Sequence, residues 1–148
     1  MISGGQTGVD RAALDAALEA GLAIGGWCPR GRQAEDGVIP ARYPLRETAS
    51  SDPAERTRLN VEGGDATLIV ACGASSPGTE LTVALAREIG RPVYLVMPGE
   101  APAPGPFGDW ILANGVRILN VAGPRESECP GIYATTRIIL SPLFTELR

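Results

Sequence analysis

An apolar run at residues 66–72, with the sequence ATLIVAC, most constrains the fold of this chain. A short continuous run of this kind predicts a strand that is buried on both faces, which is typical of a parallel sheet covered by helices. A second such run, PVYLVM, occupies residues 92–97. Each run is followed by a turn or loop and then by a helical pattern, so strands and helices alternate along the chain.

This alternation predicts an α/β protein, a single domain over residues 1–148 with a mainly parallel sheet and helices on both faces. Asp52 followed by Pro53 is a clear helix start, and Pro142 is expected to break or kink the last helix. We expect strands at residues 22–26, 45–48, 66–72, 92–97 and 116–121. We expect helices at residues 11–19, 52–64, 80–88 and 107–114, and from residue 132 onward.

Composition narrows the possible functions. The net charge is −4 and every basic residue is an arginine, without a basic cluster, which argues against binding of a nucleic-acid polymer. With 44% apolar residues but no uninterrupted apolar span of membrane length and no signal-like start, we expect a soluble, cytoplasmic protein. The absence of histidine removes the usual general base and the usual neutral metal ligand.

The three cysteines, Cys28, Cys72 and Cys129, are odd in number and far apart. They form no C-x-x-C arrangement. The spacing therefore predicts neither a disulfide framework nor a structural metal site.

Two glycine-rich turns, each leading into a helical pattern, are the main candidates for a ligand site. They are SGGQTGVDR at residues 3–11 and GASSPGT at residues 73–79. Glycine lets a ligand approach the main chain closely, and a helix start presents free N–H groups and a partial positive charge. The second turn follows the strand predicted at residues 66–72, and the first follows Met1-Ile2, which we interpret as a very short strand. The carboxyl edge of a parallel sheet could therefore bring both turns to one phosphate pocket. The alternative is that each glycine serves a tight turn and nothing more.

The commoner nucleotide motifs are absent from both turns. Neither contains the GK[ST] of a Walker A loop, and GGQTG is not G-x-G-x-x-G. No acidic residue stands at the end of a second predicted strand, where a dinucleotide-binding site needs one to hydrogen-bond the ribose. ATP hydrolysis and NAD chemistry are therefore poorly supported.

The long polar loop WCPRGRQAEDGVIPARY and the segment after the last predicted strand supply further candidates. Arginine forms bidentate contacts with anions, so Arg30, Arg32 and Arg125 could clamp a phosphate. Glu35 and Asp36 could accept hydrogen bonds from a sugar or a base, or hold a divalent ion. The alternative is a solvated loop whose charges pair with each other.

The segments SGGQTGVDRAALDAAL, GGWCPRGRQAEDGVIPARYPLRET, ATLIV with PGTELT, and NVAGPRESECPGIY together resemble the molybdenum carrier family. That family is the circularly permuted, YpsA-like branch of a Rossmann-like superfamily that also contains the LOG phosphoribohydrolases. The resemblance implies a protein that binds molybdenum cofactor (molybdopterin) or a nucleotide. We expect this protein to be a homo-oligomer and to hold no structural metal. It places one phosphate loop at Gly4, Gly5, Gln6, Thr7 and Gly8, and another at Gly78 and Thr79.

One departure from the LOG enzymes weakens a catalytic interpretation. Those hydrolases carry P-G-G-x-G-T-x-x-E, and here Thr82 stands where the glutamate is expected. Glu80 follows Thr79 directly and points elsewhere, because successive helix positions differ by about 100°. Cleavage of nucleoside 5′-monophosphates stays an alternative, with Glu80, Glu35 or Asp36 as the candidate catalytic carboxylates.

Overall fold

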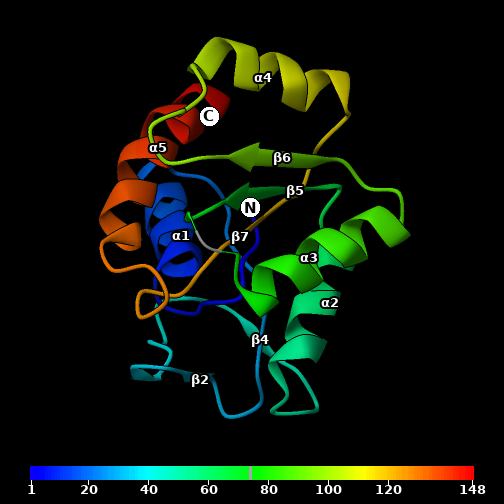
Figure 1. The fold of residues 1–148 in the computed structure, drawn as a ribbon, viewed down its shortest axis with the longest axis vertical. Helices are drawn as coiled ribbons and strands as arrows, with labels where there is room; N and C mark the ends of the chain where they lie inside the picture. The colour runs from blue at the N-terminus through cyan, green and yellow to red at the C-terminus, as the bar shows by residue number, and fades with distance from the viewer. Residues whose placement is uncertain (74) are drawn as a thin grey trace.

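The computed structural model describes residues 1–73 and 75–148, so Ala74, within the second glycine turn, lies outside the described residues. A parallel sheet runs through the molecule with helices packed around it (Figure 1). The helices are α1 (Val9–Glu19), α2 (Pro53–Gly63), α3 (Pro77–Glu88), α4 (Pro104–Ala113) and α5 (Ile132–Leu147). The strands are β1 (Trp27–Cys28), β2 (Gln33–Ala34), β3 (Gly37–Val38), β4 (Arg46–Glu47), β5 (Ala66–Val70), β6 (Val93–Val96) and β7 (Leu119–Ala122).

The central strand is β5, which pairs in parallel with β6 on one side and with β7 on the other. Single parallel bridges continue this ladder from Asn120 of β7 to Ile2, and from Ile2 to Gly25. Beyond Gly25, β1 pairs in parallel with β4, where the N–H of Arg46 donates to the carbonyl of Gly26. β2 and β3 form a separate antiparallel hairpin. The predicted Rossmann-like fold with a mainly parallel sheet is confirmed.

Helices pack on both faces of this sheet. α1 and α5 lie side by side in Figure 1 and bury Leu68 of β5 in the largest apolar cluster. α2 and α3 contribute Val61 and Leu85 to another cluster, which Val93 of β6 also contacts. Val93 is paired with Thr67, the neighbour of Leu68, and successive side chains of a strand point to opposite faces. The two helix pairs therefore cover opposite faces of the sheet.

Local signals set the starts of α2 and α3. Asp52 caps α2 by accepting a hydrogen bond from a backbone N–H at 3.0 Å, and Pro53 occupies the first helical position. Ser76 and Pro77 repeat this arrangement at α3, where the Ser76 hydroxyl accepts from the N–H of Thr79 at 3.3 Å. Such caps satisfy N–H groups that the first turn leaves unpaired. The predicted start of α2 is confirmed, whereas α3 begins at Pro77 rather than at residue 80 because its cap lies further upstream.

The strands around the first glycine turn are shorter than predicted. Residues 22–26 form no strand in the described structure but one bridge at Gly25, and the last strand begins at Leu119 rather than at residue 116. In the first of these segments the backbone hydrogen bonds occur at single positions, such as the bond from the N–H of Gly25 to the carbonyl of Met1 at 3.1 Å. Apolar runs show where a strand can form, but its length depends on how far its neighbours extend.

α5 continues through Pro142, which corrects the prediction of a break at that residue. Proline removes the N–H that would bond to the carbonyl of the residue four positions earlier. Leu140, Leu143 and Phe144 are fully buried on both sides of the proline, and their packing against the core holds the helix together. Among the described residues, no helix has both the length and the apolar character that are needed to cross a membrane.

Cys72 and Cys129 form a disulfide, which corrects the prediction that the cysteines are not paired. The two residues are 57 positions apart, but Cys72 follows β5 and Cys129 follows β7, and these strands are parallel neighbours. Their Cα atoms are 6.4 Å apart. Cys28 is a free thiol whose pKa is raised by burial. The expected cytoplasmic location stays a prediction, and in a reducing cytoplasm a disulfide is usually transient or redox-sensing.

Removal of this disulfide is expected to destabilise the fold. We expect Cys72→Ser combined with Cys129→Ser to lower the free energy of unfolding by about 4 kcal/mol, because a long cross-link reduces the entropy of the unfolded chain. Urea unfolding followed by circular dichroism measures this change. Dithiothreitol should destabilise the wild type by a similar amount and leave the double variant unaffected. Equal stability of the oxidised wild type and the double variant would contradict the prediction.

Candidate functional site

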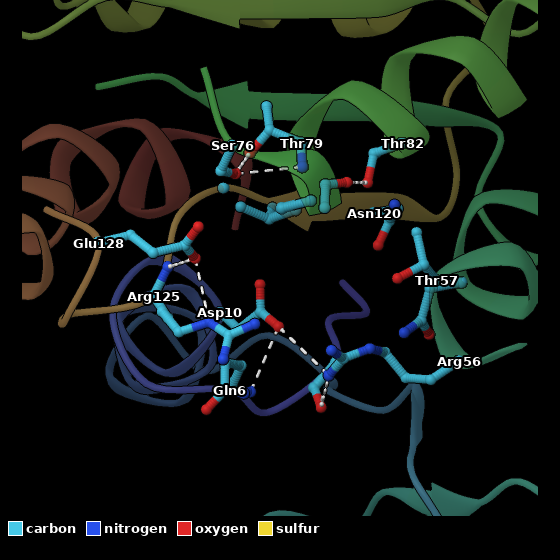
Figure 2. A pocket seen from close by; sticks show the side chains of 16 residues that line it. Gln6, Asp10, Arg56, Thr57, Ser76, Thr79, Thr82, Asn120, Arg125 and Glu128 are labelled. Atoms are coloured by element: carbon cyan, nitrogen blue, oxygen red, sulfur yellow. Dashed lines mark hydrogen bonds and ion pairs between the residues drawn. The ribbon is translucent and has the colours of Figure 1, made fainter. Parts of the chain in front are cut away.

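A cleft opens beside the carboxyl ends of β5 and β7, and Figure 2 shows the side chains that converge on it. Four parts of the chain line the cleft: the first glycine turn, α2, the start of α3, and the end of β7 with the loop that follows. The lining residues are Gly4, Gln6 and Asp10; Arg56, Thr57 and Asn60; Ser76, Gly78, Thr79 and Thr82; and residues 120–123 with Arg125 and Glu128. The two glycine turns meet here because the segments that precede them run parallel in one sheet.

The start of α3 presents backbone and hydroxyl groups that suit an anion. The hydroxyl oxygens of Ser76 and Thr79 are 2.8 Å apart, and the hydroxyl of Thr82 donates to the carbonyl of Gly78 at 2.9 Å. A Cβ added at Gly78 would meet no atom within 4 Å, so the space next to this residue is open. Because the Ser76 hydroxyl already accepts from the N–H of Thr79, the attraction of this helix start for an anion rests on the helix dipole and on the hydroxyl groups.

Only part of the first glycine turn lines the cleft. Gly4 and Gln6 line the cleft. Gly5 is instead covered on its other side, where an added Cβ would lie 2.6 Å from the side chain of Leu45 and 3.0 Å from that of Ile39. Side chains of the polar loop thus pack against the back of this turn.

Thr7 and Gly8 hold the turn against neighbouring loops and are not among the lining residues. Gly8 has a φ of +77°, and a Cβ added to it would lie 2.5 Å from the carbonyl oxygen of Pro124, so a side chain does not fit. The hydroxyl of Thr7 donates to the carboxylate of Glu35 and accepts from the N–H of Glu126 at 3.2 Å. The phosphate role predicted for these two residues stays a prediction.

Asp10 and Arg56 form a buried acid–base pair in the cleft (Figure 2). Both side chains are 11% exposed, and the distance from Arg56 Nη1 to Asp10 Oδ2 is 4.0 Å. Burial raises the pKa of Asp10, and the positive charge of Arg56 opposes this rise. Sequence reasoning missed both residues. Asp10 adjoins the glycine turn but is also an ordinary acidic residue for a helix start, and Arg56 lies in a polar helix whose pattern does not show which arginine is buried.

Two buried asparagines complete the polar lining. Asn60 bonds both backbone groups of Trp27, accepting from its N–H at 2.8 Å and donating to its carbonyl at 2.9 Å. The side-chain amide of Asn120 donates to the hydroxyl of Thr67 at 3.2 Å. Asn60 therefore fixes the start of β1 relative to α2, while Asn120 links neighbouring strands next to the cleft.

Of the three arginines predicted to clamp an anion, Arg125 lines the cleft and the other two do not. Arg125 Nε donates to Glu128 Oε1 at 3.0 Å. The guanidinium of Arg32 is instead used within its own loop, where it donates to four backbone carbonyls, and Arg30 is exposed. The acceptors of Arg32 are the carbonyl oxygens of Ile39, Pro40, Tyr43 and Leu45.

The three predicted catalytic carboxylates also lie outside the lining of the cleft. Glu35 accepts hydrogen bonds from the N–H and the hydroxyl of Ser127, at 3.1 and 2.5 Å. Asp36 pairs with Arg11 at 2.6 Å, and Glu80 is exposed on α3. Glu35 and Asp36 therefore fasten the β2–β3 hairpin to the first glycine turn and to the loop after β7.

These contacts set the protonation of the hairpin carboxylates. Burial pushes the pKa of Glu35 upward, but the hydrogen bonds from Ser127 and Thr7 together hold it below its usual value. The hydrogen bonds from Arg11 lower the pKa of Asp36 as well. Both side chains are therefore ionised at neutral pH, in the form that fastens the hairpin.

Comparisons with known proteins identify the family. The sequence model of the Circularly permutated YpsA SLOG family matches residues 1–144. The chain belongs to this family. Its structure is similar to the crystal structure of a protein from Syntrophus aciditrophicus SB named "Putative molybdenum carrier protein". The sequences are 38% identical, the match covers 96% of this chain and 92% of that chain, and the TM-score is 0.89. A search of curated proteins found no match. The resemblance noted in the sequence is confirmed.

Replacement of Glu35 should change how the stability of the fold depends on pH. A carboxylate whose pKa is lowered in the folded state stabilises the fold above its unfolded pKa, here 4.5, and this contribution is lost as the pH falls through the folded value. We therefore expect Glu35→Gln to be less stable than the wild type at pH ~7, with a difference that shrinks below pH ~4.5. Urea unfolding across this range measures it. The control is Glu80→Gln on the exposed face of α3, and a pH-independent deficit for Glu35→Gln would contradict the prediction.

Proposed function

We propose that this protein binds a small phosphorylated heterocycle in the cleft, as a carrier-like binding protein for molybdenum cofactor or for a nucleotide. The observation that carries this proposal is the open start of α3, where Ser76, Gly78 and Thr79 face a cleft that the first glycine turn also lines. A helix start of this kind can hold a phosphate without lysine. The name of the similar Syntrophus aciditrophicus protein supports a molybdenum-related ligand.

In the proposed complex, the phosphate lies against the start of α3 and the heterocycle lies toward the first glycine turn. Arg125 adds positive charge beside the phosphate, and the side chains of Gln6 and Asn120 offer polar contacts for the ring. Molybdenum cofactor is a pterin that carries a phosphate, and nucleotides have the same general plan. Among the described residues, no group of three or more His, Cys, Asp and Glu side chains could hold a metal ion. A molybdenum-bearing ligand would therefore be held through its organic part.

Binding is favoured over catalysis by the position of the acidic groups. Hydrolysis of an N-glycosidic bond needs a carboxylate that stabilises the developing oxocarbenium ion. Glu35 and Asp36 are occupied in fastening the hairpin, and Glu80 is exposed outside the lining. The two carboxylates that line the cleft are each beside an arginine, Asp10 near Arg56 and Glu128 bonded to Arg125.

A valine at Gly78 tests the phosphate site. The added side chain would occupy the open space at the start of α3, so we expect Gly78→Val to abolish ligand binding without disturbing the fold. The measurement is the shift in melting temperature with AMP, GMP, inorganic pyrophosphate and, under anaerobic conditions, molybdopterin. At least one of these should stabilise the wild type.

Gly105→Val is a matched control for this substitution. Gly105 follows the first proline of α4 as Gly78 follows that of α3, and an added Cβ meets nothing within 4 Å at either position. The control should keep the full ligand shift. The proposal is wrong if no ligand stabilises the wild type, or if Gly78→Val keeps the same ligand-induced shift in melting temperature.

The hydrolase alternative is tested by a search for free base. We expect incubation of the protein with AMP or GMP to release no adenine or guanine, because the candidate carboxylates lie outside the cleft lining. Chromatography of the reaction mixture detects either base, with heat-denatured protein as the control. Release by the native protein alone would favour the hydrolase.

A further inference from the structure

The carboxylate of Asp10 is buried in the cleft, and the protein's own groups use only part of its capacity to accept hydrogen bonds. Its Oδ2 accepts a long hydrogen bond from the N–H of Gln6 at 3.3 Å and lies 4.0 Å from Arg56. The neighbouring hydroxyl of Ser3 donates to the carbonyl of Val121 at 2.7 Å, and its closeness to Asp10 also acts to lower the pKa of that carboxyl. Figure 2 shows the carboxylate of Asp10 in the middle of the cleft, between Arg56 and Arg125. Since each carboxylate oxygen can accept more than one hydrogen bond, acceptor capacity remains for a ligand.

This carboxylate also decides which end of the cleft suits a phosphate. Asp10 lies in the first turn of α1, so in its ionised form it places a negative charge of the protein's own at the start of that helix. A phosphate placed there would be repelled. The first turn of α3 also carries an acidic residue, Glu80, but its side chain is exposed and lies outside the lining, so the groups that α3 turns toward the cleft are the neutral hydroxyls of Ser76 and Thr79. The part of a ligand near Asp10 is therefore its uncharged part.

We infer that Asp10 recognises a pair of adjacent hydrogen-bond donors on the ligand, at the end away from its phosphate. This inference rests on the proposed function and specifies the ligand class. Two chemical groups offer such a pair: the vicinal hydroxyls of a ribose, and the ring N–H beside the amino group of a 2-amino-4-oxo ring, as in guanine or a pterin. A carboxylate can accept two parallel donors from either group.

Arg56 is a positioning residue for this carboxylate. Its Nη1 donates to the carbonyl of Gly4 at 3.2 Å and its Nε donates to the carbonyl of Pro53 at 3.4 Å. These bonds leave the guanidinium beside Asp10 rather than beside the start of α3. The positive charge favours the ionised carboxylate, which is the form that accepts two donors.

Asp10→Asn tests the inference, because it keeps the shape of the side chain and replaces an acceptor with a donor. We expect the affinity for GMP, measured by calorimetry, to fall about tenfold or more, as for loss of a hydrogen bond to a charged group. The affinity for inorganic pyrophosphate, which has no donor pair, should stay unchanged or rise because a negative charge is removed. Glu128→Gln removes the other carboxylate of the cleft and should shift both affinities in the same direction.

A second measurement on the wild type removes the donors from the ligand instead. IMP lacks the 2-amino group of GMP, and 2′,3′-dideoxy-GMP lacks both hydroxyls. The wild type should bind one of these about tenfold more weakly than GMP, which identifies the donor pair, whereas Asp10→Asn should not discriminate. Equal binding of all three by the wild type, or equal losses for GMP and pyrophosphate in Asp10→Asn, would overturn the inference while the proposed function stands. Absence of binding by both GMP and pyrophosphate would instead count against the proposed function.

Discussion

Two backbone hydrogen bonds beside β7 decide where the cleft forms. The N–H of Ile2 donates to the carbonyl of Leu119 at 2.8 Å, and the carbonyl of Ile2 accepts from the N–H of Val121 at 3.0 Å. They place the second residue of the chain within the sheet, so the glycine turn that follows leaves the sheet at the same edge as the loops after β5 and β7. The hydroxyl of Ser3 adds a third link, to the carbonyl of Val121. These bonds fix the beginning of the first turn relative to the loop that leads into α3.

The cleft that results has two helix starts of different character. α1 begins with a buried carboxylate, Asp10, and α3 begins with the hydroxyls of Ser76 and Thr79. A helix dipole attracts an anion at either start, but an ionised Asp10 would offset that attraction at α1. The two glycine turns look alike in the sequence, yet the residues beside them give one end of the cleft hydroxyl groups and the other a buried carboxylate, which is the difference on which the proposed orientation of the ligand rests.

The features that the sequence predicted are those set by local chemistry. The apolar run of β5, the cap at Asp52 and the glycine turns all depend on a few neighbouring residues. The Cys72–Cys129 disulfide and the Asp10–Arg56 pair depend on strand order, which spacing along the chain does not reveal. Arg32 shows the same limit, because an arginine that bonds backbone carbonyls has the same sequence appearance as one that binds a phosphate.

The carboxylates of the polar loop look like ligand-binding groups in the sequence, but they affect the cleft indirectly. Glu35 ties the hairpin to Thr7 and Ser127, and the disulfide joins the loops after β5 and β7, which both border the cleft. A site whose walls are already fixed loses less conformational entropy when a ligand binds. The back of the first glycine turn is held by the protein's own side chains, so Gly4 and Gln6 line the cleft in a position that the proposed ligand would not need to order. In the proposed complex, the carboxylates of the hairpin would support ligand binding through the turn rather than through direct contact.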